Sequence, residues 1–196
     1  MINRVCVFCA SSDLSDRIYL DAAYKLGETL AENSIEIIYG GGSAGCMGML
    51  ANGALAKGGK VFGVIPKFMY DLEWGHESIT ELKIVESLSE RKEMMIKETD
   101  AAIALPGGSG TLEELFETIT LKRLGVYLSP IIMVNIKNFF NPCIQLLEDA
   151  VKEKFMDERN MLMWKVVSEV NEVLPAITNS SSWFSEARNF ATLRKK

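Results

Sequence analysis

The chain has 196 residues, of which 48% are hydrophobic and 24% charged, proportions typical of a folded protein rather than a disordered one. Its 21 basic and 26 acidic residues give a net charge of −5, so it lacks the broad positive field expected of a nucleic-acid-binding protein. A chain of this length holds one well-packed domain, and we expect a single domain over residues 1–196.

Short apolar runs alternate with helical patterns along the chain, and most of these runs are apolar throughout, as in strands covered on both faces. The expected strands are Arg4–Cys9, Glu36–Tyr39, Lys60–Ile65, Leu82–Val85, Ala101–Leu105, Pro130–Val134 and Asn160–Trp164. The expected helices are Asp16–Asn33, Gly45–Lys57, Ser89–Thr99, Thr111–Leu124, Phe140–Glu153, Ser168–Ile177 and Ser181–Thr192, before a frayed end at Arg194–Lys196. This alternation predicts an α/β fold, a doubly wound and mostly parallel sheet with helices on both faces, which binds ligands beyond the carboxyl ends of its strands.

The cysteines and the apolar runs bear on the location of the protein and on metal binding. No run reaches the roughly 18 apolar residues of a membrane span, and the apolar stretch near the N-terminus is too short for a signal peptide. The four cysteines are scattered, mostly inside apolar runs, which favours reduced thiols and a cytoplasmic location. Cys6 and Cys9 have the spacing of half a zinc site, but residues three apart in a strand face opposite sides, so we expect no metal there.

A first glycine-rich loop, Gly-Gly-Gly-Ser-Ala-Gly over residues 40–45, follows an expected strand and opens a helix. Because a helix N-terminus carries partial positive charge, we expect Gly41, Gly42 and Gly45 to bind a phosphate; a tight turn with close helix–sheet packing is the alternative. Gly40, Gly42 and Gly45 also match a dinucleotide fingerprint. The acidic residue that would bind the ribose is missing after the next strand, which argues against a nicotinamide-dependent oxidoreductase.

A second loop, Pro-Gly-Gly-Ser-Gly-Thr-Leu-Glu-Glu over residues 106–114, again joins a strand to a helix and offers a cradle of hydrogen-bond donors. One face of this helix is apolar and must pack on the sheet, whereas the opposite face carries Glu113, Glu114, Glu117 and Thr120. The helix dipole favours acidic residues in the first turn and should keep them ionised. The dipole alone does not explain why two glutamates lie beside a glycine cradle with no charge partner nearby in sequence. An ionised carboxylate at a sugar-phosphate site can stabilise positive charge or activate water.

A third element starts with Ser87 and Glu90, which have the spacing of a capping box. Arg91 then shares the apolar side of a helix with Met94 and Met95. The guanidinium either reaches past these side chains to water or points at an anion in the cleft, and the pattern leaves both open.

Residues 106–114 fit the PGGxGTxxE signature of the "lonely guy" family, which the sequence resembles from about Val5 to about Leu174. These are cytokinin riboside 5′-monophosphate phosphoribohydrolases, many once misnamed lysine decarboxylases. The first glycine loop and the pair Arg91 and Lys92 resemble further family elements in the family's order. The resemblance implies a Rossmann-like nucleotide-binding domain, at least a homodimer, and hydrolysis of the N-glycosidic bond of a nucleoside 5′-monophosphate, such as a cytokinin riboside monophosphate or AMP, to free base and ribose 5-phosphate.

Carried over residue by residue, the resemblance makes Arg91 and Glu114 the catalytic pair. The matching substrate-binding positions are Glu73, Arg91, Lys92, Gly108, Ser109, Gly110, Thr111, Leu112, Glu113, Glu114 and Thr120. The sequence departs from the family at Leu88 and Ser89, where Met-His is usual, and at Cys46, where the first loop usually has Leu.

In the expected mechanism, Glu114 stabilises an oxocarbenium-like transition state and accepts a proton from the attacking water, while Arg91 positions the nucleotide. No metal or other cofactor is required, and no cluster of metal ligands is visible in the sequence. We interpret the single histidine, His76, as a surface-loop residue. The alternative function is a non-catalytic nucleotide-binding or molybdenum-cofactor-binding protein, which shares glycine loops but does not need the pair Arg91 and Glu114.

Overall fold

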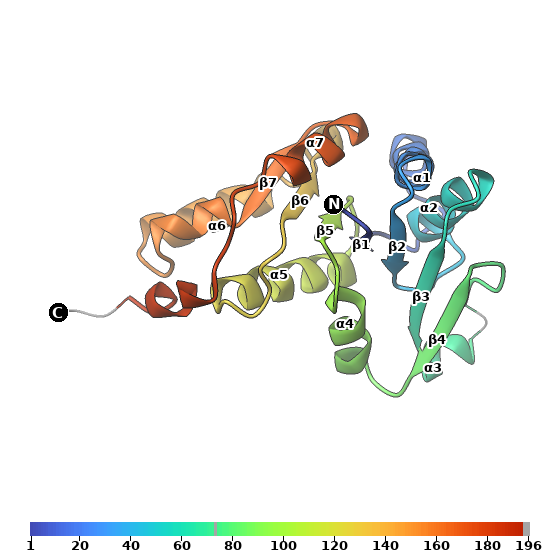
Figure 1. Cartoon of the computed structure of the whole chain (residues 1–196), viewed down its shortest axis with the longest axis horizontal. Helices are drawn as coiled ribbons and strands as arrows, with labels where there is room; N and C mark the ends of the chain where they lie inside the picture. The colour runs from blue at the N-terminus through green and yellow to red at the C-terminus, as the bar shows by residue number, and fades with distance from the viewer. Residues whose placement is uncertain (73, 194–196) are drawn as a thin grey trace.

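The computed structural model describes residues 1–72 and 74–193. Within them, seven strands form one sheet in the order β4-β3-β2-β1-β5-β6-β7, and every neighbouring pair is parallel (Figure 1). The strands are β1 (Arg4–Phe8), β2 (Glu36–Tyr39), β3 (Val61–Pro66), β4 (Glu81–Val85), β5 (Ala101–Ala104), β6 (Ile131–Val134) and β7 (Trp164–Val167). The predicted α/β fold is confirmed.

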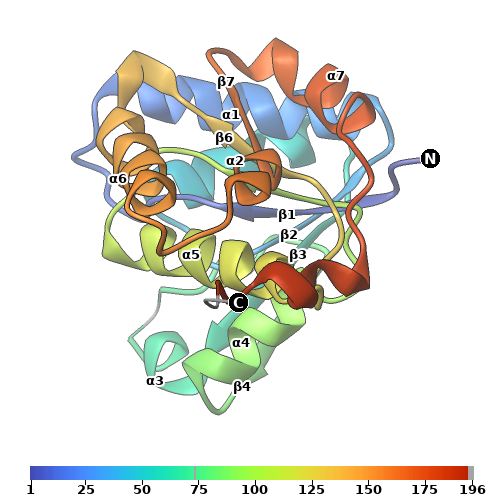
Figure 2. The same cartoon turned by 90° about the vertical axis from the view of Figure 1, so that its left-hand side faces the viewer.

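Helices connect the strands and cover both faces of the sheet. They are α1 (Arg17–Glu32), α2 (Gly45–Ala56), α3 (Lys67–Tyr70), α4 (Leu88–Ile96), α5 (Ser109–Arg123), α6 (Asn141–Lys152) and α7 (Val173–Thr178). Helices α1, α2 and α7 pack on one face, and α4, α5 and α6 pack on the other (Figure 2). Among the described residues, no helix is both long enough and apolar enough to cross a membrane.

The side chains of the strands alternate between two hydrophobic clusters, one on each face of the sheet. In β1, Val5 and Val7 belong to the cluster with α1 and α2, whereas Cys6 and Phe8 belong to the cluster with α5. Cys9 lies in the first cluster, so Cys6 and Cys9 face opposite sides as predicted. In the described part of the chain, no group of three or more His, Cys, Asp or Glu residues could hold a metal ion.

The strand order reverses at β1, which pairs with β2 on one side and with β5 on the other. The chain leaves β1 through α1 toward β2, and later returns from β4 through α4 to reach β5. Open α/β sheets bind ligands at such a switch point, beyond the carboxyl ends of the two central strands. The loops that follow Phe8 and Ala104 therefore border the position where a ligand is expected.

Local hydrogen bonds explain where α4 begins. The Oγ of Ser87 accepts a hydrogen bond from the N–H of Glu90 at 3.1 Å. This is one of the two hydrogen bonds that form a capping box. The second bond differs from a capping box, because the carboxylate of Glu90 accepts from the N–H of Glu86 at 3.0 Å and not from the N–H of Ser87. The helix therefore starts at Leu88, one residue earlier than predicted.

The predicted strand Asn160–Trp164 is wrong. Residues Glu158–Leu162 form a 3-10 helix, and β7 begins only at Trp164. The apolar run before Trp164 resembles a buried strand, whereas β7 is an edge strand that exposes Lys165 and Val166 and so has no continuous apolar pattern.

Three further differences concern short elements. The predicted helix over residues 168–177 consists of a 3-10 turn at Val170–Glu172 followed by α7, and that over residues 181–192 is a 3-10 helix at Ser185–Phe190. The short helix α3 was not predicted. The frayed end expected at residues 194–196 lies outside the described residues.

Candidate active site

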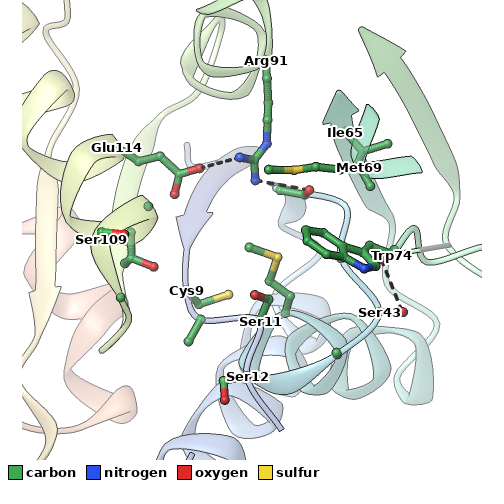
Figure 3. A pocket seen from close by; sticks show the side chains of 18 residues that line it. Cys9, Ser11, Ser12, Ser43, Ile65, Met69, Trp74, Arg91, Ser109 and Glu114 are labelled. Carbon is green, nitrogen blue, oxygen red and sulfur yellow. Dashed lines mark hydrogen bonds and ion pairs between the residues drawn. The ribbon is translucent and has the colours of Figure 1, made fainter. Parts of the chain in front are cut away.

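A cavity of about 620 Å³ opens at the switch point of the sheet (Figure 3). The loop after β1, the first glycine loop with the start of α2, and the start of α5 form three sides of its wall. The remaining side comes from the end of β3, helix α3 with the loop after it, and a single side chain of α4. The cavity therefore lies where the topology of the sheet predicts a ligand.

Arg91 from α4 and Glu114 from α5 meet on the wall of this cavity. Nη1 of Arg91 lies 3.3 Å from Oε1 of Glu114, and their side chains are 9% and 5% exposed. The guanidinium also donates from Nε to the carbonyl of Val64 at 3.1 Å and from Nη2 to the carbonyl of Gly40 at 3.3 Å. The sequence leaves open whether the guanidinium of Arg91 reaches to water or points into the cleft. In the structure it points into the cleft.

Gly40 provides the space for this arginine. A Cβ atom built at Gly40 would collide with Nη2 of Arg91, so a larger residue at position 40 would displace the guanidinium. One of the glycines of the first loop is thereby required for the position of the ion pair.

The buried position of Glu114 changes its protonation. Burial raises the pKa of this carboxyl from 4.5 to about 7, although the guanidinium of Arg91 acts in the opposite direction. With this pKa the carboxyl is about half ionised near neutral pH, so the expectation that the helix dipole keeps Glu114 fully ionised does not hold there. Removal of the carboxylate from water outweighs the nearby positive charges. A pKa near 7 suits a group that accepts and releases a proton during a reaction.

The N-terminus of α5 offers free hydrogen-bond donors to the cavity. Gly108, Ser109, Gly110 and Thr111 line the wall, and the N-cap residue Gly108 has no side chain to cap the helix. Among the described residues, no protein group accepts a hydrogen bond from the backbone N–H groups of Ser109, Gly110 and Thr111. A helix N-terminus with unpaired N–H groups is a binding site for an anion such as phosphate.

The first glycine loop is arranged differently. The N–H of Gly45 donates to the carboxylate of Asp13 at 2.7 Å, and the N–H of Ser43 donates to the carbonyl of Trp74 at 3.0 Å. Gly42 lines the cavity, whereas Gly41 and Gly45 do not. Phosphate binding by this loop stays a prediction, and an acidic side chain already lies at the N-terminus of α2.

Four of the predicted substrate-binding residues lie outside the cavity wall. Nζ of Lys92 lies 2.5 Å from Glu113 and 2.6 Å from Glu117, so these two acids have a charge partner that is distant in sequence. Leu112 packs against the hydrophobic core, and the exposed Thr120 hydrogen-bonds to a carbonyl of its own helix. Contacts of Lys92, Leu112, Glu113 and Thr120 with substrate stay predictions, and Glu73 lies outside the described residues.

The interpretation of His76 as a surface residue is wrong. Its side chain is buried, with Nε2 3.3 Å from Oδ1 of Asn52 and Nδ1 accepting the N–H of Ser78 at 3.3 Å. The imidazole does not line the cavity. It instead attaches the loop after α3 to helix α2.

Several residues of the cavity wall carried no recognised signal in the sequence. Ser11 and Ser12 follow β1 at the switch point, and the adjacency of β1 and β5 in a doubly wound sheet could have identified them. Cys9 lies in the same loop, and burial raises the pKa of its thiol, so the thiol remains neutral. The apolar residues Ile65 and Met69 also line the cavity, but no charge or motif marks them. Met47 lines it from the first glycine loop, and Trp74 from the acid-rich stretch over residues 71–77 that the sequence predicts to be a loop over the site.

Comparisons with known proteins identify relatives of this chain. A family model described as "Possible lysine decarboxylase" matches residues 47–177. A "Probable cytokinin riboside 5′-monophosphate phosphoribohydrolase" of Oryza sativa subsp. japonica is 43% identical over 153 residues, which are 78% of this chain and 63% of that protein. A cytokinin riboside 5′-monophosphate phosphoribohydrolase of Arabidopsis thaliana is 42% identical over 78% of this chain and 72% of its own length. The chain thus spans less than two thirds of the length of the rice relative.

Solved structures share the fold at low sequence identity. The molybdenum cofactor carrier protein of Chlamydomonas reinhardtii has a TM-score of 0.69 and 17% identity, over 91% of this chain and 97% of that one. The X-ray structure of TM1055 has a TM-score of 0.71 and 20% identity, over 90% of this chain and 99% of that one. The fold alone does not separate an enzyme from a carrier, but the similarity in sequence identifies the family of the chain. It belongs to the family of the cytokinin riboside 5′-monophosphate phosphoribohydrolases, which the lysine decarboxylase model also describes.

Proposed function

We propose that this protein hydrolyses the N-glycosidic bond of a nucleoside 5′-monophosphate and releases a free base and ribose 5-phosphate. The observation that carries the proposal is the buried pair of Arg91 and Glu114 on the wall of a cavity, one helical turn from the uncapped N-terminus of α5. The names of the relatives, which are phosphoribohydrolases of cytokinin riboside 5′-monophosphates, support the same reaction.

The start of α5 provides the binding site for the phosphate. Ser109, Gly110 and Thr111 line the cavity, their backbone N–H groups have no acceptor among the described residues, and two of these residues add hydroxyl groups. Negative charge is favourable at a helix N-terminus, because the dipole and the free donors act together. A phosphate bound there leaves the ribose beside Glu114, which lies one turn further along the same helix.

Glu114 then acts on the anomeric carbon. As the bond from C1′ to the base nitrogen breaks, its electron pair leaves with the base and C1′ becomes electron-poor, so a nearby carboxylate lowers the barrier. Water forms the new bond to C1′ and gives a proton to Glu114, while the released base takes a proton from solvent. The pKa near 7 allows Glu114 to release its proton afterwards.

Arg91 supports this chemistry through its fixed position beside Glu114. Its guanidinium is hydrogen-bonded to two backbone carbonyls, so the charge stays at a defined place beside Glu114. From there it can hold the nucleotide by charge-assisted hydrogen bonds.

The test is to incubate the purified protein with AMP and with an N6-substituted AMP, and to measure free base and ribose 5-phosphate. We expect both products in equal amounts, and a loss of at least about 100-fold in Glu114→Gln. Glu117→Gln, a matched change on the same helix at a residue that does not line the cavity, should keep the activity. Nucleotide binding without release of ribose 5-phosphate would instead identify a carrier.

We further propose a homodimer and a cytoplasmic location. Three large apolar side chains at the start of α4 and after α5 are strongly exposed: Leu88 at 42%, Leu124 at 41% and Val126 at 70%. We propose that these three side chains lie in the contact between the two subunits, because an apolar patch on a protein surface marks an interaction site. Light scattering should give twice the mass of the chain, and Val126→Glu should lower it. The four free cysteines suit a reducing compartment.

A further inference from the structure

We propose that the indole of Trp74 is the surface on which the nucleobase stacks, so this residue selects ligands that carry a planar base. The inference rests on the proposed function, and adds the place of the base and the residue that recognises it.

The cavity has a polar end and an apolar end. Ser109 and Glu114 lie on one side of the cavity, while Trp74, Met69 and Ile65 lie on the other, with the guanidinium of Arg91 between them (Figure 3). A nucleotide with its phosphate at the start of α5 and its anomeric carbon at Glu114 has its base directed away from α5. The base therefore reaches the apolar end, where an aromatic ring is available.

The exposure of Trp74 shows that the chain itself does not cover this ring. The residue lines the cavity and is 53% exposed, whereas Trp164 and Trp183 are 6% and 9% exposed. A tryptophan needed only for packing would be covered like these two. An exposed indole that lines a cavity is suited to stacking against another planar group.

The backbone holds Trp74 in place over the cavity. Its carbonyl accepts the N–H of Ser43 at 3.0 Å and the Oγ of the same serine at 3.4 Å. The next residue, Gly75, forms an antiparallel bridge with Gly42, and the N–H of His76 donates to a carbonyl of the same glycine loop at 2.9 Å. These bonds fix the loop before a ligand arrives, which limits the entropy lost when a base stacks.

The first experiment compares Trp74→Ala, Trp74→Phe and the control Phe155→Ala, which removes an aromatic ring that is 78% exposed and does not line the cavity. It measures KM and kcat for AMP, and the inhibition constant of ribose 5-phosphate, which lacks the base. Stacking of one base on an aromatic side chain corresponds to roughly a 5- to 150-fold change in affinity. Trp74→Ala should raise KM within this range, Trp74→Phe should restore most of it, and Phe155→Ala should have no effect.

The inhibition constant of ribose 5-phosphate separates stacking from a general loss of the site. It should stay within about twofold in both Trp74 variants, because the sugar phosphate does not reach the apolar end. An unchanged KM for AMP, or a parallel rise in the inhibition constant of ribose 5-phosphate, would overturn the proposal. The fluorescence experiment, which does not need the alanine variant, keeps the proposal testable if that variant does not fold.

The second experiment does not depend on turnover. In Glu114→Gln, addition of AMP should change the tryptophan fluorescence, and the additional change Trp74→Phe should abolish that response, since the other two tryptophans are buried. Hydrolysis of AMP by the unaltered protein with no fluorescence response would overturn the role of Trp74 and leave the proposed function intact. A response without hydrolysis would support the role of Trp74 and overturn the proposed function.

Discussion

Nη1 of Arg91 and Oε1 of Glu114 lie 3.3 Å apart although 23 positions separate them in the sequence. Helix α4 brings the arginine to the end of the sheet and α5 brings the acid, so the pair exists only in the folded chain. Burial raises the pKa of Glu114 and the guanidinium lowers it, and the balance lies at about 7. The charge of Arg91 therefore acts on the protonation of Glu114, and changes to either residue have predictable effects.

The raised pKa of Glu114 predicts how stability changes with pH. The folded carboxyl has a pKa of about 7 and the unfolded one 4.5, so the folded state binds more protons between these values. The stabilisation is complete below the unfolded value and is lost as the pH rises through 7, a decrease of about 3 kcal/mol in the free energy of unfolding. Denaturant titrations of the unaltered protein and Glu114→Gln at about pH 5 and about pH 8 measure this. Equal pH dependence in both would contradict the raised pKa.

Removal of Arg91 should shift the pH dependence of the reaction. The guanidinium lowers the pKa of Glu114, so Arg91→Ala should move the acidic limb of kcat/KM to higher pH. It should also decrease hydrolysis by at least about 100-fold, because the nucleotide and the acid lose their positioning group. The measurement is a pH–rate profile, with Lys97→Ala, an exposed residue just after α4, as the control. A slow variant with an unshifted profile would show that the two side chains are not coupled.

Alanine at Gly40 and alanine at Gly110 should change different kinetic constants. Gly40→Ala places a Cβ against Nη2 of Arg91, so kcat should fall as the ion pair is displaced. Gly110→Ala adds a methyl group in open space on the first turn of α5, where it should raise KM by obstructing the phosphate site. Alanine also has the higher helix propensity, so Gly110→Ala should leave the melting temperature unchanged or raise it. A lower melting temperature in Gly110→Ala, or an unchanged kcat in Gly40→Ala, would contradict this geometry.

The buried Lys122 should limit the stability of the protein without affecting the reaction. Its Nζ donates to the carbonyl of Ser129 at 2.5 Å and lies 5.9 Å from the ring of Trp183, and burial lowers its pKa from 10.5 to about 8. Below about pH 8 the lysine is charged in both states, and its transfer from water disfavours the folded one. This penalty decreases as the pH rises from about 8 to 10.5, where the unfolded state binds more protons.

Lys122→Met should therefore raise the free energy of unfolding at pH 7 by up to about 3 kcal/mol, and the gain should shrink toward pH 10. Thermal denaturation at the two pH values measures this, with Lys97→Met as an exposed control that should change little. A variant that is less stable than the unaltered protein at pH 7 would show that the hydrogen bond to Ser129 outweighs the burial of charge.

The sequence predicts the central elements of the fold well because each signal there is local. The runs at β5 and β6 are apolar throughout, and those at β1 and β2 are apolar after one charged first residue. In the structure all four are buried apart from that first residue of β1 and β2. Near the C-terminus the signal fails, since β7 lies at the sheet edge with two exposed residues and the last helices are too short for a clear period.

The sequence predicts a site residue when its charge or a run of glycines distinguishes it. It does not predict a residue that reaches the cavity only through the way the chain packs. Arg91, Glu114 and the start of α5 stand out by charge or by glycine content, and the structure brings them together. Ile65 and Met69 are ordinary apolar residues in the sequence, and only the packing of β3 and α3 brings them to the cavity wall. The protonation of Glu114 could not be predicted either, because its burial depends on packing between α4, α5 and the sheet rather than on its place in the helix.

A crystal structure of Glu114→Gln with AMP bound tests the central claim most directly. We predict the phosphate on the backbone N–H groups of Ser109, Gly110 and Thr111, and the side chain at position 114 against the anomeric carbon. A nucleotide with its phosphate elsewhere, or with its anomeric carbon out of reach of position 114, would contradict the assignment of this cavity as the site of hydrolysis.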